Sequence, residues 1–287
     1  MKGLGKSARG LLITGAQGHV GRALRRVFDE GAALDLPVLW HGRRPGPGVD
    51  LAWDIGVGDA PDLPKGLIIL HLAARLKGSA EELQENSRST RALCQVARLS
   101  DAAHVFVMSS AAVYQPAPGE LAETARTVPT GPYGQSKLDA EKVAEQVLPN
   151  GGLTLLRLAN LAGGDTLFHF LRMGGPITLD PIEGQVGGPH RSYIGPRSLA
   201  TCLQDLVTLA ADGQTLPRVL NLAQPGVIAM ADILDAVGQE WTYGPPRAAA
   251  IPSVVVATGL LQSLVRLPEA SAAGLVAEVR SLPGWPQ

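Results

Sequence analysis

The sequence predicts an α/β protein built on a Rossmann-type, doubly wound parallel sheet, with a smaller C-terminal lobe. Two observations carry this prediction. Short apolar runs alternate with helical patterns up to residue 160, which is typical of βαβ units. A glycine-rich turn separates the first run from the helical pattern that follows it. We expect one domain over residues 1–160 and a second lobe over residues 161–287, with some later segments returning to the first domain.

The expected strands are short, unbroken apolar runs, as strands buried on both faces of a sheet should be. They cover residues 10–15, 37–42, 66–74, 104–110 and 153–160. Longer stretches between them predict crossover helices at residues 20–30, 79–99 and 134–147. Beyond residue 160 glycine and proline are frequent, and the clearest elements are a strand at 219–223 and a helix at 230–237.

Composition excludes several classes of function. The formal net charge of −1 and the pI near 6.6 give no broad attraction to nucleic acid or to an anionic membrane. Cys94 and Cys202 have no CxxC spacing and the six histidines form no HExxH pattern, so we expect neither a disulfide framework nor a metal site. The apolar run near the N-terminus passes straight into glycines and is interpreted as a strand, and no run is long enough to span a bilayer. A cytoplasmic protein is expected.

A nucleotide-binding turn is expected in "LLITGAQGHVGRALRRVF". Gly15, Gly18 and Gly21 stand between a strand and a helix in a GxxGxxG spacing. Glycine allows the tight turn, the close approach of backbone to a pyrophosphate, and the packing of the helix on the sheet, while the helix N-terminus supplies amide donors. Glycine-rich turns also occur without a ligand, but the strand before and the helix after this one are the context that the motif requires.

The second strand should lie beside the adenosine ribose, and it ends in "WHGRRPG". No Asp or Glu is present there to bind a free 2′-hydroxyl. Arg43 and Arg44 follow instead, and arginine at this place accepts a 2′-phosphate, so we expect NADP rather than NAD. The alternative is a pair of solvated loop arginines.

An acidic residue for the adenine amino group is expected shortly afterwards, in "DLAWDIG". Asp54 offers a carboxylate and Ile55 an apolar wall for the ring. Asp50 with Leu51 fits almost as well, and either acid could instead cap a loop.

The stretch "GPYGQSKLDAEKV" places Tyr133 and Lys137 four positions apart at the start of a helix, and so on one helix face. An ammonium at roughly 5 Å, in an effective dielectric of about 20, would favour the phenolate by about 3 kcal/mol and lower the tyrosine pKa by about two units. The tyrosine could then serve as a general acid and base at neutral pH. Taken alone, the spacing also describes an ordinary surface helix, so the interpretation depends on the other motifs.

Several motifs occur in a characteristic order along the chain, and in this order the chain resembles the extended short-chain dehydrogenases/reductases, the NAD(P)-dependent sugar epimerase/dehydratase family. The resemblance implies an NAD(P)-binding Rossmann domain at 1–160, a mainly substrate-binding lobe at 161–287, and often a homodimer formed through the helices at 79–99 and 134–147. The motifs are "TGAQGHVG" (14–21), "HLAA" (71–74), "NSRST" (86–90), "VMSSAAVYQ" (107–115), "YGQSK" (133–137) and "LRLANLAGG" (156–164), with weaker matches in "RSYIG" (191–195) and "LNLAQPG" (220–226).

The resemblance also implies roles for particular residues. Tyr133 and Lys137 match the catalytic YxxxK pair, and Ser110 matches the catalytic serine or threonine, with Ser109 as its rival. Asn86 matches an asparagine near the active site, although a helix cap fits it equally well. The expected substrate contacts are Ser110, Asn160 and Arg191. The expected cofactor contacts are Gly15, Gln17, Gly18, His19, Val20, Gly21, Arg43, Arg44, Asp54, Ile55, Leu72, Ala73, Ala74 and Lys137.

Departures from the family pattern narrow the reaction. Ala111 and Ala112 occupy the positions of the Asp-Glu pair with which sugar dehydratases of this family eliminate water, so a dehydratase is disfavoured. Ser198 stands where an acidic residue is usual, which leaves the identity of the substrate open. We expect an oxidoreductase or epimerase that acts at a secondary alcohol or ketone of a sugar or nucleotide sugar. The alternative is a non-catalytic NAD(P)-binding sensor or scaffold of the same fold.

Overall fold

The computed structural model describes residues 10–30, 36–57 and 59–282. Its main sheet has seven strands: β1 (Leu11–Thr14), β2 (Val38–Gly42), β3 (Leu51–Ala52), β4 (Ile68–His71), β5 (His104–Ser110), β7 (Leu153–Leu158) and β12 (Val219–Leu222). They lie in the order β12-β7-β5-β4-β1-β2-β3, and all neighbouring pairs are parallel. The order reverses between β1 and β4, and the carboxyl ends of strands at such a point are where open α/β sheets bind ligands.

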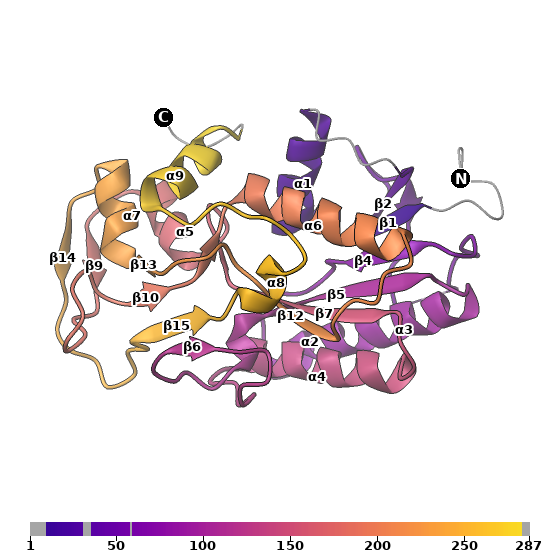
Figure 1. Ribbon diagram of the computed structural model, residues 1–287, viewed down its shortest axis with the longest axis horizontal. Helices are drawn as coiled ribbons and strands as arrows, with labels where there is room; N and C mark the ends of the chain where they lie inside the picture. The colour runs from indigo at the N-terminus through magenta and orange to yellow at the C-terminus, as the bar shows by residue number, and fades with distance from the viewer. Residues whose placement is uncertain (1–9, 31–35, 58, 283–287) are drawn as a thin grey trace.

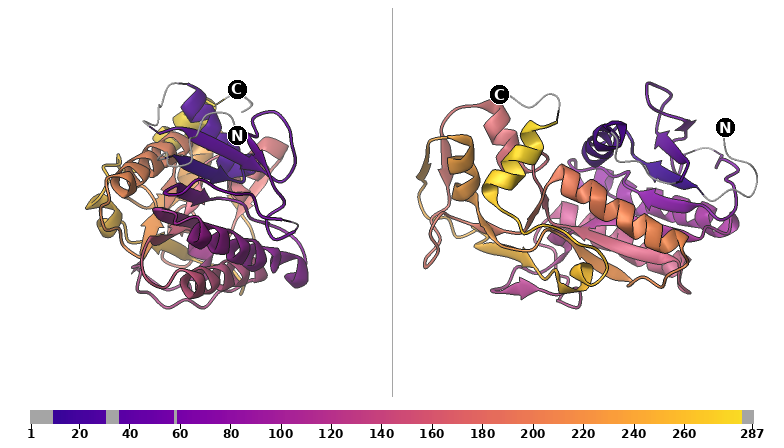
Figure 2. Two further views of the ribbon diagram at one scale, coloured as in Figure 1. Left: turned by 90° about the vertical axis from the view of Figure 1, so that its right-hand side faces the viewer. Right: turned by 45° about the horizontal axis from the view of Figure 1, so that its top comes forward.

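Helices cover both faces of this sheet, as the prediction of a doubly wound fold requires (Figures 1 and 2). On one face α1 (His19–Asp29) packs against α6 (Pro196–Ala211), and α8 (Gly259–Gln262) lies against β12. On the other face α3 (Glu85–Leu99) packs against α4 (Pro132–Val147). Each face has its own apolar core, the first around Leu24 and Leu203 and the second around Leu93 and Ala144.

A smaller lobe lies at the end of the molecule remote from β1 and β2 (Figure 1). Its core joins α5 (Thr166–Met173), α7 (Met230–Val237) and α9 (Ala272–Arg280) around Phe168 and Tyr193. The shorter strands form a sheet in the order β13-β10-β15-β6 and two separate pairs, β11 with β8 and β14 with β9. Their bounds are β6 (Glu120–Leu121), β8 (Asn160–Leu161), β9 (Ile177–Leu179), β10 (His190–Arg191), β11 (Tyr193–Ile194), β13 (Ile228–Ala229), β14 (Trp241–Tyr243) and β15 (Ser253–Val256).

The chain after residue 160 contributes to both parts of the molecule. β12 adds to the main sheet beside β7, and α6, which the sequence patterns did not predict, runs along the same sheet and packs against α1. Figure 2 shows α6 on the face opposite α3 and α4.

The predicted elements agree with the observed ones except in their bounds and at one helix. β5 and α7 have the predicted limits, but the strand expected at 66–74 is limited to β4. The single helix predicted at 79–99 is wrong, because α2 (Ala80–Leu83) and α3 are separate and meet at Gln84. Ser79 and Glu82 form a reciprocal capping box, in which the Ser79 backbone nitrogen donates to Glu82 Oε2 at 2.8 Å, and this box fixes the start of α2 at the beginning of the predicted range.

Candidate active site

The site begins at the turn between β1 and α1. Gly15 has φ +75°, and a Cβ on it would lie 2.7 Å from the backbone nitrogen of Ala73. A Cβ on Gly21 would overlap the carbonyl oxygen of Gly15. Only glycine therefore fits these two positions without moving the backbone. Gly18 is the N-cap of α1, so the first amides of the helix have no acceptor within it and are available to an anion.

Buried hydrogen bonds tie this turn to the "HLAA" segment after β4. Thr14 Oγ1 accepts from the backbone nitrogens of Leu72 and Ala73, at 3.1 and 3.3 Å. The hydroxyl hydrogen of Thr14 is therefore left for His71 Nδ1, 2.8 Å away. Burial, with a smaller contribution from the nearby Lys137 ammonium, lowers the pKa of His71 to about 3. A neutral imidazole thus holds the two segments together.

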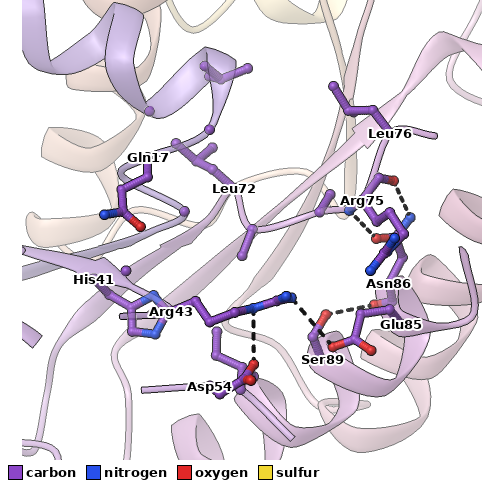
Figure 3. A pocket seen from close by; sticks show the side chains of 18 of the residues that line it. Gln17, His41, Arg43, Asp54, Leu72, Arg75, Leu76, Glu85, Asn86 and Ser89 are labelled. Atoms are coloured by element: carbon purple, nitrogen blue, oxygen red, sulfur yellow. Dashed lines mark hydrogen bonds and ion pairs between the residues drawn. The ribbon is translucent and has the colours of Figure 1, made fainter. Parts of the chain in front are cut away.

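These segments form part of the wall of a cavity of about 410 Å³ (Figure 3). The cradle of glycines and the free amides of α1 suit the pyrophosphate of a dinucleotide. Of the predicted cofactor contacts, Arg44 and Lys137 do not line this cavity, and the other predicted residues do. The wall also contains residues not predicted as cofactor contacts: His41, Gly42, Trp53, Arg75, Leu76, Glu85, Asn86 and Ser89.

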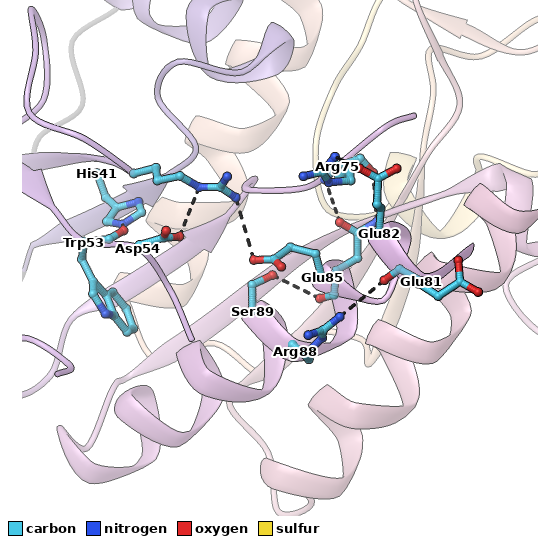
Figure 4. Close-up of polar contacts among 11 residues, drawn as sticks. His41, Trp53, Asp54, Arg75, Glu81, Glu82, Glu85, Arg88 and Ser89 are labelled. Atoms are coloured by element: carbon cyan, nitrogen blue, oxygen red, sulfur yellow. Dashed lines mark hydrogen bonds and ion pairs between the residues drawn. The ribbon is translucent and has the colours of Figure 1, made fainter. Parts of the chain in front are cut away.

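At one end of the cavity Arg43 lies between two carboxylates (Figures 3 and 4). Its Nε is 3.1 Å from Asp54 Oδ1, and its Nη2 is 3.8 Å from Glu85 Oε1. The alternative acid, Asp50, accepts a hydrogen bond from the backbone nitrogen of Trp40 at 2.9 Å and is not part of the cavity wall. Of the two acids weighed for the adenine, only Asp54 therefore faces the cavity.

His41 and Trp53 add two unpaired polar atoms to this end of the wall. His41 Nε2 is hydrogen-bonded to the Trp53 carbonyl oxygen at 2.7 Å, and burial lowers the pKa of His41. Among the residues that the structure describes, His41 Nδ1 and Trp53 Nε1 are buried without a hydrogen-bond partner. Sequence reasoning missed both, although they stand in the quoted stretches "WHGRRPG" and "DLAWDIG", because roles were assigned there only to the arginines and to the acids with their apolar neighbours.

The three residues expected to be catalytic meet where β5 ends and α4 begins. Ser110 is the last residue of β5, and its hydroxyl lies close enough to that of Tyr133 to oppose the rise of the phenol pKa. Tyr133 and Lys137 lie one turn apart near the start of α4. Asn86, in the cavity wall, donates to Ser136 Oγ at 2.9 Å. This hydrogen bond attaches α4 to the wall of the cavity.

The expected lowering of the Tyr133 pKa by Lys137 is not found. Burial raises the pKa of the Tyr133 phenol to about 12, outweighing the opposite effect of the Ser110 hydroxyl. The Lys137 amino group donates to the carbonyl oxygen of Met108, 2.8 Å away, and burial lowers its pKa to about 8. Helix spacing puts both side chains on one face, but a carbonyl of the neighbouring strand determines where the lysine nitrogen points.

A buried ion pair supports this part of the site, and sequence reasoning missed it. Arg157 donates from Nε and Nη2 to the two carboxylate oxygens of Glu141, at 3.0 and 2.8 Å. Ser109 Oγ donates to Glu141 Oε1 at 2.5 Å, so the rival of Ser110 is already engaged. The guanidinium also stacks 4.8 Å from the ring centre of Tyr114. The signal in the sequence was the position of Glu141, one helical turn beyond Lys137.

The two other predicted substrate residues make internal hydrogen bonds. Asn160 Nδ2 donates to Asp165 Oδ2 at 3.3 Å, and Tyr193 donates to the same oxygen at 2.8 Å. The Arg191 guanidinium donates to backbone carbonyl oxygens, including that of Ile251 at 2.9 Å. Neither Asn160 nor Arg191 lines the 410 Å³ cavity.

Comparison with known proteins gives the family of the chain. The model of the NAD dependent epimerase/dehydratase family matches residues 11–169, which is more than half of the chain. The chain belongs to this family. The match covers the glycine turn, the "HLAA" segment and all three residues at the start of α4 and the end of β5. No curated protein sequence is significantly similar to the chain.

Solved structures of other members of this fold are similar over nearly the whole chain. MoeE5, in complex with UDP-glucose and NAD, has a TM-score of 0.75 at 22% identity and covers 94% of this chain and 97% of its own. The dTDP-glucose 4,6-dehydratase DesIV of Streptomyces venezuelae, a double mutant, has a TM-score of 0.71 at 19% identity, covering 96% and 98%. The UDP-N-acetylglucosamine 4-epimerase of Bacillus cereus has a TM-score of 0.70 at 18% identity, covering 95% and 98%. At these identities the likeness shows the fold alone.

Neither a metal site nor a membrane span is found in the described ranges. No group of three or more His, Cys, Asp or Glu there could hold a metal ion. No helix in those ranges is long and apolar enough to cross a membrane. Cys94 and Cys202 are both buried free thiols, and burial raises the pKa of each to about 12.

Proposed function

We propose that this family member is an NAD(P)-dependent oxidoreductase or epimerase that acts at a secondary alcohol or ketone of a sugar or nucleotide sugar. The observation that carries the proposal is the meeting of Ser110 with Tyr133, with Lys137 one turn along α4 and the glycine-lined cavity joined to the same helix through Asn86 and Ser136. A bound nicotinamide would exchange a hydride with the carbon that bears the reacting oxygen. The residues of the chain then have to supply the proton and hold the oxygen.

The protonation state of Tyr133 favours the direction of ketone reduction. With its pKa raised to about 12, the phenol is protonated at neutral pH and ready to donate a proton to a developing alkoxide. Ser110 would donate a second hydrogen bond to the same oxygen. To act as a base in the reverse direction, the phenol needs a cation nearby, which Lys137 would provide by turning from the Met108 carbonyl oxygen toward it.

Elimination of water is disfavoured in this proposal. Ala111 and Ala112 form the 3₁₀ turn directly after Ser110 (Ala111–Val113), and neither can carry a proton. The family includes epimerases and dehydratases, and solved structures of both kinds resemble the chain. The sugar substrate is proposed because MoeE5 was solved with UDP-glucose. A homodimer through α3 and α4 and a cytoplasmic location remain predictions.

The preference for NADP remains a prediction. Arg43 lines the cavity as expected, but it is shared with Asp54 and Glu85, and Arg44 is not in the cavity wall. Measuring the dissociation constants of NADP and NAD by calorimetry tests the preference directly. Tighter binding of NAD would contradict it.

Mass spectrometry of the small molecules released from freshly purified protein would identify cofactor and substrate together. With a substrate in hand, Tyr133→Phe should lower kcat at least a hundredfold, the lower range for loss of a general acid, and leave the cofactor dissociation constant within about twofold. The control is Tyr243→Phe, an exposed tyrosine of the small lobe whose hydroxyl accepts from the Gly187 nitrogen at 3.0 Å. Full turnover by the Tyr133 variant would remove Tyr133 from the mechanism.

A non-catalytic NAD(P) sensor is the second candidate. The observation in its favour is the position of Lys137, whose nitrogen is bonded to Met108 while the Tyr133 pKa is raised. A protein that binds NAD(P) tightly but oxidises or reduces no sugar nucleotide, and in which Tyr133→Phe changes nothing, would support this candidate instead.

A further inference from the structure

The structure adds a carboxylate that the sequence analysis did not expect, that of Glu85, to the end of the cavity where Arg43 and Asp54 lie. Arg43 comes from the loop after β2, Asp54 from the loop after β3, and Glu85 from the first turn of α3 (Figure 3). The guanidinium bridges the two carboxylates, at 3.1 and 3.8 Å. Two negative side chains and one positive side chain leave this end of the cavity with a net charge of −1.

This negative charge should weaken the binding of NADP more than that of NAD. The adenosine 2′-position carries a neutral hydroxyl in NAD and a phosphate in NADP, and the phosphate requires a cation. The cavity wall has one other arginine, Arg75, and its Nη1 is 3.1 Å from Glu82 Oε1. A 2′-phosphate would therefore have to compete with two carboxylates for the guanidinium of Arg43.

Glu85 and Asp54 differ in the contacts that each carboxylate can make besides the one with Arg43. Asp54, beside Ile55 in the cavity wall, is placed to contact the adenine of either cofactor. In the described part of the chain, the Glu85 carboxylate makes no side-chain interaction other than the one with Arg43. Its side chain is 29% exposed, so water screens its charge only in part.

We propose that Glu85 is a specificity-determining residue, which weakens the binding of NADP relative to NAD by holding Arg43 and repelling a 2′-phosphate. The inference rests on the proposed NAD(P)-dependent function. It concerns the ratio of the two affinities and holds whichever cofactor the protein prefers. Glu85 of α3 would thus have the effect on cofactor preference that an acid at the end of β2 usually has.

The test is Glu85→Gln, which keeps the shape of the side chain and removes its charge. Calorimetric titration of the purified variant with each cofactor should show NADP binding roughly three- to tenfold tighter and NAD unchanged within about twofold, from Coulomb attraction at a partly exposed site. The gain for NADP should shrink as salt is added, because the interaction is electrostatic.

Glu81→Gln is the matched control. Glu81 belongs to the neighbouring α2, does not line the cavity, and lies beyond Glu85 on the side away from Asp54 (Figure 4). Its removal changes the net charge of the protein equally and should leave both affinities unchanged. An equal change for NAD and NADP in Glu85→Gln, no change for either, or the same gain in the Glu81 control would overturn the role of Glu85. If the unaltered protein binds neither cofactor, the proposed function fails as well.

Discussion

His71 should make the stability of the protein depend on pH in a way that a single substitution can isolate. The ring is 2% exposed, and its Nδ1 accepts the hydrogen of Thr14, whose oxygen already accepts from two backbone nitrogens. Protonation of Nδ1 would place two hydrogens between the ring and the hydroxyl. It would also put a charge in a buried site near Lys137. The folded protein therefore keeps His71 neutral.

The size of the effect follows from the difference in pKa between the two states. The folded pKa of His71 is lowered from 6.5 to about 3, so between these values the unfolded chain binds a proton that the folded chain does not. Stability consequently falls as the pH falls, by about 1.4 kcal/mol per pH unit. Between pH 7 and pH 5 this residue alone removes about 2 kcal/mol from the free energy of unfolding.

Urea unfolding of the unaltered protein and of His71→Asn, at pH 7 and at pH 5, measures this contribution. Asn can place its amide oxygen near the position of Nδ1, and its other costs cancel when each protein is compared with itself at two pH values. The variant should lose about 2 kcal/mol less than the unaltered protein between the two pH values. His169→Gln, at an exposed position of α5, is the control and should lose as much as the unaltered protein. Equal losses in the unaltered protein and in His71→Asn would refute the assignment of a neutral, proton-accepting His71.

Two further substitutions test the turn and the buried ion pair. Gly15→Ala should abolish detectable cofactor binding, and in urea unfolding it should destabilise the protein by more than Gly213→Ala does. Both glycines have φ +75°, so the backbone strain of the substitution is alike at the two positions. Only a Cβ on Gly15 meets a neighbour, the nitrogen of Ala73 at 2.7 Å, because Gly213 faces open space. Similar losses of stability in the two variants would show that the close approach of Gly15 to Ala73 does not contribute to the stability of the protein. Arg157→Met should lower the free energy of unfolding by about 3–5 kcal/mol, because it leaves the Glu141 carboxylate buried without its ion-pair partner. Adding Glu141→Gln should restore part of this loss. A double variant no more stable than Arg157→Met would contradict this account.

The parts of the site that could be predicted from the sequence are those in which a motif and its structure lie in the same short segment. Gly15, Gly18 and Gly21 act within one turn, and the spacing of Tyr133 and Lys137 is a property of one helix. The parts that could not be predicted depend on partners distant in sequence.

The orientation of Lys137 shows why the four-residue spacing of Tyr133 and Lys137 did not determine the pKa of the phenol. The i, i+4 relation places the lysine on the face of the phenol, but the Met108 carbonyl oxygen on β5 offers a hydrogen bond that the helix alone does not. The raised pKa of Tyr133 likewise comes from burial by other segments. A pairwise Coulomb estimate contained neither the competing acceptor nor the desolvation, and it therefore gave the wrong direction.

The sequence by itself determined most strands and helices up to residue 160, the glycine turn and the spacing of Tyr133 and Lys137 on α4, because hydrophobic periodicity and backbone conformation are set by near neighbours along the chain. Only the tertiary structure decided which charges surround Arg43, which serine faces Tyr133, and that β12 and α6 return to the first sheet. Electrostatic interactions and burial act through space, so their outcome depends on residues that only folding brings together.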